Sequence, residues 1–249
     1  MLKPDLLDKL FFYLSVPTCV SCKEKLSIDD LALCPKCYAE YEKIATRNCS
    51  VCSKVLSECT CSNDYLEKHF VKRLVKVFRY NQRPENLAAN SIIYSLKRDN
   101  RKDVLKLCTH LLVGAIKSAL GECDDYLITN VPRRRSAILQ YGMDHSALLA
   151  KSVAKALGAE YRSILKSKAK KAQKNLRGDE RVANIEFKIK KSIDLKRRKV
   201  IIVDDVVTSG TSMGVAASLI RSLGARNITG AALAIAFKDK YAPPIFTFN

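Results

Sequence analysis

Two adjacent carboxylates, Asp204 and Asp205, are followed closely by a hydroxyl-rich turn, and this combination suits a phosphorylated sugar. The turn consists of Thr208, Ser209, Gly210, Thr211 and Ser212. A helix that begins in the turn would direct unpaired backbone N–H groups and its positive dipole end toward an anion. Carboxylates repel phosphate, so the two acids would face vicinal hydroxyls or a divalent cation shared with the phosphates. A phosphorylated ribose offers both features.

The elements on either side of this site are predicted from hydrophobic pattern. Val200–Val203 is a short β-branched run, which is typical of a strand buried on both faces in the middle of a parallel sheet. Apolar residues at helical spacing continue from Met213 to Leu223, and Gly224 is suited to end that helix. The alternative interpretation of the acids and the turn is a buried strand followed by an ordinary polar turn and helix cap.

Eight of the ten cysteines lie between residues 19 and 61 and form pairs at short spacing. The pairs are Cys19 and Cys22, Cys34 and Cys37, Cys49 and Cys52, and Cys59 and Cys61. Two such pairs complete a tetrahedral zinc shell, so the sequence predicts two structural zinc ions with no catalytic role. Sequential grouping, with residues 19–37 on one ion and 49–61 on the other, is the simplest arrangement, and an interleaved grouping stays open.

A disulfide framework is the alternative interpretation of these cysteines, and it would need an oxidising compartment. The sequence shows no secretory signal and no membrane span, so we expect a cytoplasmic protein with reduced thiols. Cys108 and Cys123 stand apart from the pairs, and we expect them to be small apolar residues of the core. The formal net charge of +19 predicts anionic partners, nucleic acid first and acidic lipid second.

Strands and helices are predicted to alternate along the rest of the chain. The patterns indicate strands at 70–80, 125–131 and 228–237, and helices at 4–16, 84–97, 103–120 and 143–157. Such alternation predicts an α/β fold with a parallel sheet flanked by helices and a ligand at the carboxyl ends of the strands.

Three basic segments have two interpretations each. Arg133, Arg134 and Arg135 follow the strand at 125–131, where they suit a pyrophosphate or form a solvent-facing or nucleic-acid-binding turn. The lysine-rich stretch 166–181, with Lys170 and Lys171, suits a mobile lid over a pyrophosphate or is a solvated charge run. Residues 95–100 either border the ligand site or form a solvated helix end, which we favour.

The segment 200–212 resembles the phosphoribosyl pyrophosphate (PRPP) motif of type I phosphoribosyltransferases: four apolar residues, two acids, two apolar residues and a Thr/Ser-Gly-Thr loop. With the cysteine pairs, Tyr94–Lys97, and the residues Gln173, Leu176, Arg181 and Asn184, the whole chain resembles the ComF family of competence and DNA-uptake proteins. The chain departs from that family at 141–145, where Tyr-Gly-Met-Asp-His replaces Arg-Gly-Phe-Asn-Gln and only the glycine is kept.

The resemblance implies a double zinc ribbon at 1–68 followed by a phosphoribosyltransferase-like domain at 69–249. It also implies magnesium-bound PRPP as ligand, single-stranded DNA as a partner and DNA-uptake proteins as further partners. Asp204 and Asp205 would orient the ribose, and Arg133 and Arg134 would contact the pyrophosphate. The implied PRPP-binding residues are Val203, Asp204, Asp205, Thr208, Ser209, Gly210, Thr211, Ser212, Arg133 and Arg134. An active phosphoribosyltransferase of nucleotide salvage, which transfers the sugar to a nitrogen base, is the alternative function.

Overall fold

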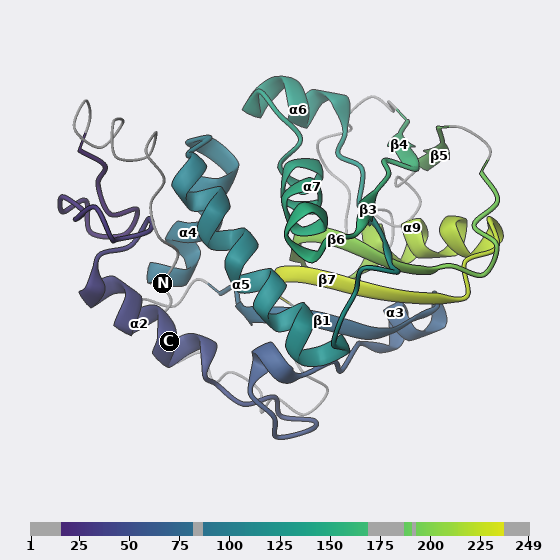
Figure 1. Cartoon of the computed structure of the whole chain (residues 1–249), viewed down its shortest axis with the longest axis horizontal. Helices are drawn as coiled ribbons and strands as arrows, with labels where there is room; N and C mark the ends of the chain where they lie inside the picture. The colour runs from purple at the N-terminus through teal and green to yellow at the C-terminus, as the bar shows by residue number, and fades with distance from the viewer. Residues whose placement is uncertain (1–15, 82–86, 169–186, 191–192, 237–249) are drawn as a thin grey trace, which may run out of the picture.

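The computed structural model describes residues 16–81, 87–168, 187–190 and 193–236, and Figure 1 shows their arrangement. In these ranges the helices are α2 (Pro35–Ala45), the 3-10 turn η1 (Leu56–Glu58), α3 (Asp64–Lys68), α4 (Leu87–Arg98), α5 (Lys102–Leu120), α6 (Arg135–Tyr141), α7 (His145–Leu157) and α9 (Thr211–Ser222). The strands are β1 (Val71–Arg79), β2 (Leu127–Asn130), β3 (Glu160–Tyr161), β4 (Leu165–Ser167), β5 (Phe187–Ile189), β6 (Lys199–Val207) and β7 (Asn227–Ile235).

A five-stranded parallel sheet forms the centre of the molecule, with the order β1-β7-β6-β2-β3. β4 and β5 form a separate antiparallel pair. The α/β class and the central position of the 200–203 strand are therefore confirmed. The predicted strands at 70–80, 125–131 and 228–237 correspond to β1, β2 and β7, although each is shorter than predicted.

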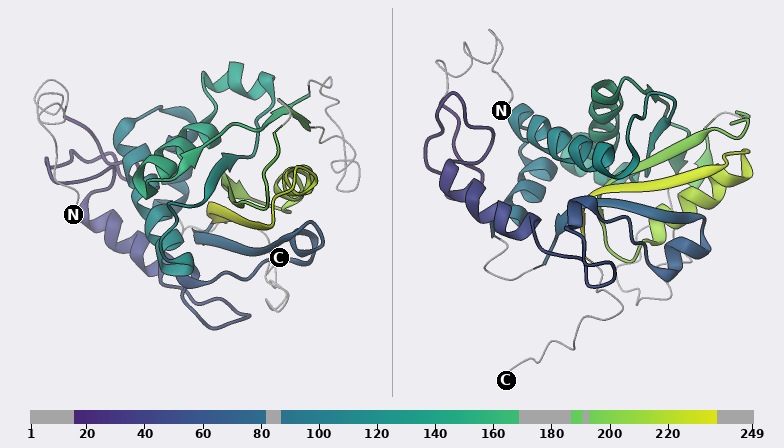
Figure 2. Two further views of the ribbon diagram at one scale, coloured as in Figure 1. Left: turned by 45° about the vertical axis from the view of Figure 1, so that its right-hand side comes forward. Right: turned by 60° about the horizontal axis from the view of Figure 1, so that its bottom comes forward.

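Helices cover both faces of the sheet, as the two views in Figure 2 show. α4, α5 and α7 pack on one face, where Ile201 and Val203 of β6 point. α3 and α9 pack on the other face, where Val200 and Ile202 point. Both faces of β6 are thus buried, which explains its unbroken apolar run.

The predicted helix ends agree with the structure in two places. Gly158 follows α7 in the left-handed conformation, with φ 68°, and Gly224 lies just beyond α9 with φ 93°. A residue without a Cβ adopts these angles at little cost. The predicted helix at 4–16 and the proposed lid residues Lys170 and Lys171 lie outside the described residues, as does Pro84. Among the described residues, no helix is both long and apolar enough to cross a membrane.

Candidate functional site

The two acids lie inside β6 and not at its tip as predicted. β6 stays paired with β7 as far as Val207, whereas its pairing with β2 ends at Val203 opposite Asn130. Asp204 and Asp205 therefore follow the point where β2 stops, and side chains from other elements reach them there. Both acids thus lie beyond the carboxyl end of β2 but within the paired length of β6 and β7.

Asp205 is buried and forms ion pairs with two cations. Its side chain is 5% exposed, Oδ2 pairs with the Arg133 guanidinium, and the same oxygen lies 3.5 Å from Nζ of Lys97. Oδ1 accepts a hydrogen bond of 2.8 Å from the backbone N–H of Val206. The structure therefore brings Arg133 to the acid pair. The favoured interpretation of residues 95–100 as a solvated helix end is wrong for Lys97, whose charge is directed to a buried carboxylate.

Asp204 has a different environment, in which its side chain accepts a hydrogen bond from one hydroxyl group. Ser146 at the start of α7 donates a hydrogen bond of 2.8 Å to Oδ1, which also accepts the Asp205 N–H at 2.9 Å. Burial and the neighbouring charge of Asp205 raise the pKa of Asp204 to about 7. Near neutral pH this carboxyl group therefore exists in both protonation states.

Replacing Asp204 by asparagine is expected to change the pH dependence of stability. Because the pKa is raised from 3.8 to about 7, the folded chain keeps a proton that the unfolded chain releases. The contribution of Asp204 to the free energy of unfolding is therefore most favourable below pH 4. It is lost as the pH rises to 7, by at most about 1.4 kcal/mol per pH unit. Urea unfolding at pH 5 and pH 8 checks this: the variant should gain stability relative to the original chain at pH 8. An equal difference at both pH values contradicts it.

The hydroxyl-rich turn leads directly into α9. Gly210, the N-cap residue, precedes the helix with φ 84° and offers no capping side chain. The hydroxyls of Ser209 and Thr211 lie 2.7 Å apart, and the Thr211 N–H donates to Ser209 Oγ at 3.3 Å. Thr208 and Ser209 are exposed. A hydroxyl-rich turn at a helix start is suited to an anion, and here it follows the acid pair by a few residues.

His145 is the first residue of α7, two residues after the predicted start of this helix, and is buried. Its Nε2 lies 3.2 Å from Oδ1 of Asn100. Burial, together with the charge of Arg133, lowers the pKa of His145. Asp144 caps the helix through a hydrogen bond from Ala147 N–H and so does not orient the imidazole. These contacts give His145 a packing role beside the site.

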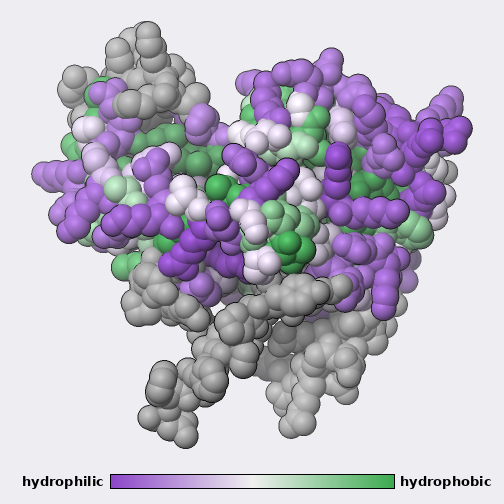
Figure 3. All heavy atoms as spheres, turned by 90° about the horizontal axis from the view of Figure 1, so that it is seen from below, coloured by the Kyte–Doolittle hydropathy of each residue, from purple (hydrophilic) through white to green (hydrophobic). Residues whose placement is uncertain are grey.

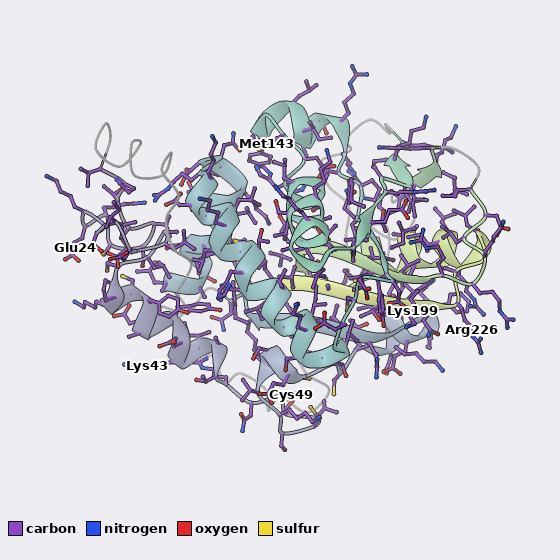
Figure 4. All side chains as sticks on the ribbon, viewed as in Figure 1. Glu24, Lys43, Cys49, Met143, Lys199 and Arg226 are labelled. Atoms are coloured by element: carbon purple, nitrogen blue, oxygen red, sulfur yellow. The ribbon has the colours of Figure 1, made fainter. Side chains whose placement is uncertain are left out.

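The cysteines form two groups of four, and the sequential grouping is correct. In each group the four sulfur atoms lie within 4.8 Å of one another. All ten cysteines are free thiols, and Cys108 and Cys123 are fully buried in the core as predicted. We call residues 19, 22, 34 and 37 the first cluster and residues 49, 52, 59 and 61 the second cluster. Figure 4 labels Glu24 beside the first cluster and Cys49 in the second, which lie at opposite ends of α2.

Both clusters begin with the same local turn. Cys19 N–H donates to Glu24 O and Cys49 N–H donates to Lys54 O, each at 2.7 Å. Each turn closes with a residue at positive φ, 68° at Lys23 and 58° at Ser53. In the second cluster the N–H groups of Val51 and Cys61 point at cysteine sulfurs, at 3.4 and 3.3 Å. Four convergent sulfurs with backbone donors suit a closed tetrahedral zinc site.

A buried lysine lies beside the second cluster. Lys76 of β1 is 2% exposed, and its Nζ donates to the carbonyl oxygens of Cys61 at 2.6 Å and Leu74 at 3.3 Å. A zinc ion held by four thiolates carries a net negative charge, which a buried ammonium group offsets. Sequence reasoning missed this residue, because β1 also carries Lys72, Arg73 and Arg79 and its pattern does not single out Lys76.

Residues 143–247 match the model of the phosphoribosyl transferase domain family. Over 206 residues the chain is 22% identical to "Competence protein ComFC" of Streptococcus pneumoniae (strain ATCC BAA-255 / R6), covering 80% of this chain and 86% of that protein.

Solved structures with a similar fold include a purine phosphoribosyltransferase from Pyrococcus horikoshii Ot3, with 17% identity over 58% of this chain and 93% of that chain and a TM-score of 0.36. An adenine phosphoribosyltransferase from Saccharomyces cerevisiae is 19% identical over 55% of this chain and 72% of that chain, with a TM-score of 0.38.

The chain is therefore an α/β protein with a phosphoribosyltransferase domain and two N-terminal cysteine clusters. It is a homologue of ComFC, and the resemblance to the ComF family is confirmed.

Proposed function

We propose that this chain binds magnesium-bound PRPP at Val203–Ser212 and acts in DNA uptake during natural transformation. The observation that carries the proposal is the acid pair where β2 ends, with Asp205 buried and Asp204 half-buried, followed at once by a hydroxyl turn at the start of α9 whose Thr208 and Ser209 are exposed. The acids suit ribose hydroxyls, and the turn and the helix start suit the 5-phosphate. The match to the phosphoribosyl transferase domain model covers this segment and supports the same ligand.

Arg133 is the proposed pyrophosphate contact, together with Arg134. One nitrogen of the Arg133 guanidinium pairs with Asp205, and a guanidinium has further N–H donors. The group therefore keeps its ion pair while other donors face an incoming phosphate. Lys97, which is 33% exposed, contacts the same carboxylate oxygen and can shift to an anion.

If the chain catalyses transfer of the sugar, substrate positioning and charge stabilisation account for most of the rate enhancement. The transition state for displacement at the anomeric carbon resembles an oxocarbenium ion, which an ionised Asp204 stabilises by its charge. With a pKa of about 7, Asp204 also donates a hydrogen bond to a ribose hydroxyl when protonated. Whether PRPP is consumed depends on an acceptor base, and for that base no residue is proposed.

PRPP binding is tested by calorimetry with MgCl2 present, at pH 8. We expect Asp204→Asn to bind about 10- to 100-fold more weakly, because it loses charge-assisted hydrogen bonds to the sugar. Asp125→Asn is the matched control, since that acid pairs with Lys199 at the amino ends of the strands, away from the site (Figure 4). Equal affinity in all three proteins would overturn the site assignment.

Incubation with PRPP and a panel of nitrogen bases distinguishes a PRPP-binding protein of DNA uptake from an active phosphoribosyltransferase. Release of pyrophosphate from PRPP with any base of the panel would make the chain an active phosphoribosyltransferase of nucleotide salvage. PRPP binding without release supports a sensor or scaffold in DNA uptake.

Single-stranded DNA is the proposed macromolecular partner. The support is the net charge of +19 and the similarity to a competence protein. Hydrophilic side chains cover most of the described surface on the face shown in Figure 3. Fluorescence anisotropy with labelled single strands should show log K falling linearly with log salt, with a slope near −0.7 for each phosphate contacted. Affinity that does not change with salt contradicts this partner.

We further propose the cytoplasm as the location, because clusters of reduced thiols persist there. We also propose a boundary at 68/69 between the cysteine-rich segment and the phosphoribosyltransferase-like domain. α3 lies on the N-terminal side of this boundary but packs on α9, so the two parts share a core.

A further inference from the structure

The short segment after the second cluster contacts the hydroxyl turn directly. Asn63 Nδ2 donates a hydrogen bond of 3.2 Å to the carbonyl oxygen of Ser209. The other end of the same amide, Oδ1, accepts the N–H of Leu66 at 2.9 Å and so caps α3. One side chain therefore fixes the start of α3 and the middle of the turn at a defined separation.

The α3 segment also packs closely on the first turns of α9. A Cβ atom added to Gly210 would lie 2.7 Å from Cγ of Leu66, and one added to Gly214 would lie 2.7 Å from Cε1 of Tyr65. His69 Nδ1 lies 2.8 Å from Oγ of Ser218, one turn further along α9. Both glycines are therefore required for α3 to approach this closely, and any displacement of α3 removes support from the turn.

The second cluster fixes the chain just before α3. Leu74 N–H donates to Thr60 O at 3.0 Å, and Lys76 Nζ donates to Cys61 O at 2.6 Å, so the Cys59–Cys61 segment is attached to β1. Cys49 and Cys59 belong to the same apolar cluster as Leu66 and Met213. A metal ion that joins residues 49 and 52 to 59 and 61 would hold this segment from its other side.

Within the described residues, the first cluster has no such connection to the 208–212 turn. Its buried cysteines pack with residues of α2, α4 and α5 on the opposite face of the sheet. The two clusters, although built from the same local turn, therefore support different parts of the molecule.

We propose that metal binding at the second cluster positions the 208–212 turn through α3, with Asn63 as the positioning residue, and that the first cluster has no such effect. The role of the turn in holding a sugar phosphate rests on the proposed function. The effect of metal binding on the position of the turn does not depend on the proposed function.

Substitutions at Asn63 test the connection in the full, zinc-loaded chain without ligand. Asn63→Asp keeps an oxygen that caps α3 but loses the donor to Ser209 O, whereas Asn63→Ala loses both. Hydrogen exchange of amides 208–214 should become about fivefold faster in both variants, as expected for the loss of one hydrogen bond. Exchange within α3 should become faster only in Asn63→Ala. Unchanged exchange of 208–214 in Asn63→Asp would overturn the role of Asn63.

Matched cysteine pairs test the role of the metal. Cys49→Ser/Cys52→Ser and Cys19→Ser/Cys22→Ser should each lower the zinc content by one ion per chain. Only the former should accelerate exchange of amides 208–214, again by about fivefold or more. If the former does not fold, limited chelation of Cys19→Ser/Cys22→Ser protein removes the remaining zinc before the same measurement. Equal acceleration by both pairs, or none by the second-cluster pair, would overturn the proposal.

The outcome is separable from that of the PRPP experiment, because exchange is measured without ligand. Accelerated exchange with no PRPP binding leaves the coupling intact and removes the proposed function. PRPP binding with unchanged exchange leaves the proposed function intact and removes the coupling. With both intact, Asn63→Ala should also weaken PRPP binding by about two- to tenfold.

Discussion

The purified protein is expected to contain two zinc ions per chain, and Cys59→Ser should reduce that number to one with a large loss of stability. Cys59 is fully buried among the four sulfurs of the second cluster. If removing one ligand releases the metal, the buried Lys76 ammonium is left without the net negative zinc–thiolate charge that it would offset. Because structural zinc contributes on the order of 10 kcal/mol to the folding of small zinc domains, this should be among the most destabilising single substitutions in the chain.

Cys108→Ser provides the matched control. Cys108 is equally buried, is a free thiol and lies outside both clusters. Its replacement places a hydroxyl group in an apolar site and should cost only about 1–3 kcal/mol, without any change in zinc content. Metal analysis and thermal unfolding of the two variants check the prediction. Cysteines oxidised to disulfides, with no zinc bound, would remove the metal assignment, and equal destabilisation with unchanged zinc would remove the second site.

The two neighbouring acids of β6 should respond to substitution with opposite signs. Asp205→Asn is expected to lower the free energy of unfolding at pH 8 by about 2–3 kcal/mol, because Arg133 and Lys97 then lose their buried partner. This value is smaller than for a wholly buried pair, since Lys97 is 33% exposed and water screens its charge.

Asp204→Asn should raise stability at the same pH, because it removes an acid whose pKa is raised to about 7 by burial and by Asp205. Urea unfolding of both single variants and of the double variant provides the measurement. The double variant also reports the repulsion between the two carboxylates, since adjacent charges are not additive. If both single variants are destabilised equally, the acids do not have the separate roles that their contacts indicate.

The different contacts of Asp204 and Asp205 decide which single variant is the better probe in the calorimetric test of PRPP binding. Because Asp205 holds two cations in place, its replacement alters the site itself as well as any ligand contact. Asp204→Asn leaves the Arg133–Asp205 pair present. It is therefore the sharper probe of sugar binding.

The sequence by itself determined the features whose patterns are local. Paired acids before a Thr/Ser-Gly-Thr turn, cysteines at two-residue spacing and the periods of strand and helix each occupy a short stretch, so they indicated the α/β class, the clusters and the candidate site. Local spacing also favoured the sequential grouping of cysteines, which the converging sulfur atoms confirm.

Only the tertiary structure decided which distant side chains meet these motifs. Lys97 on α4, Ser146 on α7 and Arg133 after β2 converge on the acids because β2 stops at Asn130 while β6 continues. Asn63 meets Ser209 although 146 positions separate them. A contact between residues so far apart depends on the packing of whole helices on the sheet, and no single stretch of sequence carries that information. The acid pair and Arg133 were therefore visible in the sequence, while the Arg133–Asp205 ion pair, Lys97 and the support of the turn were not.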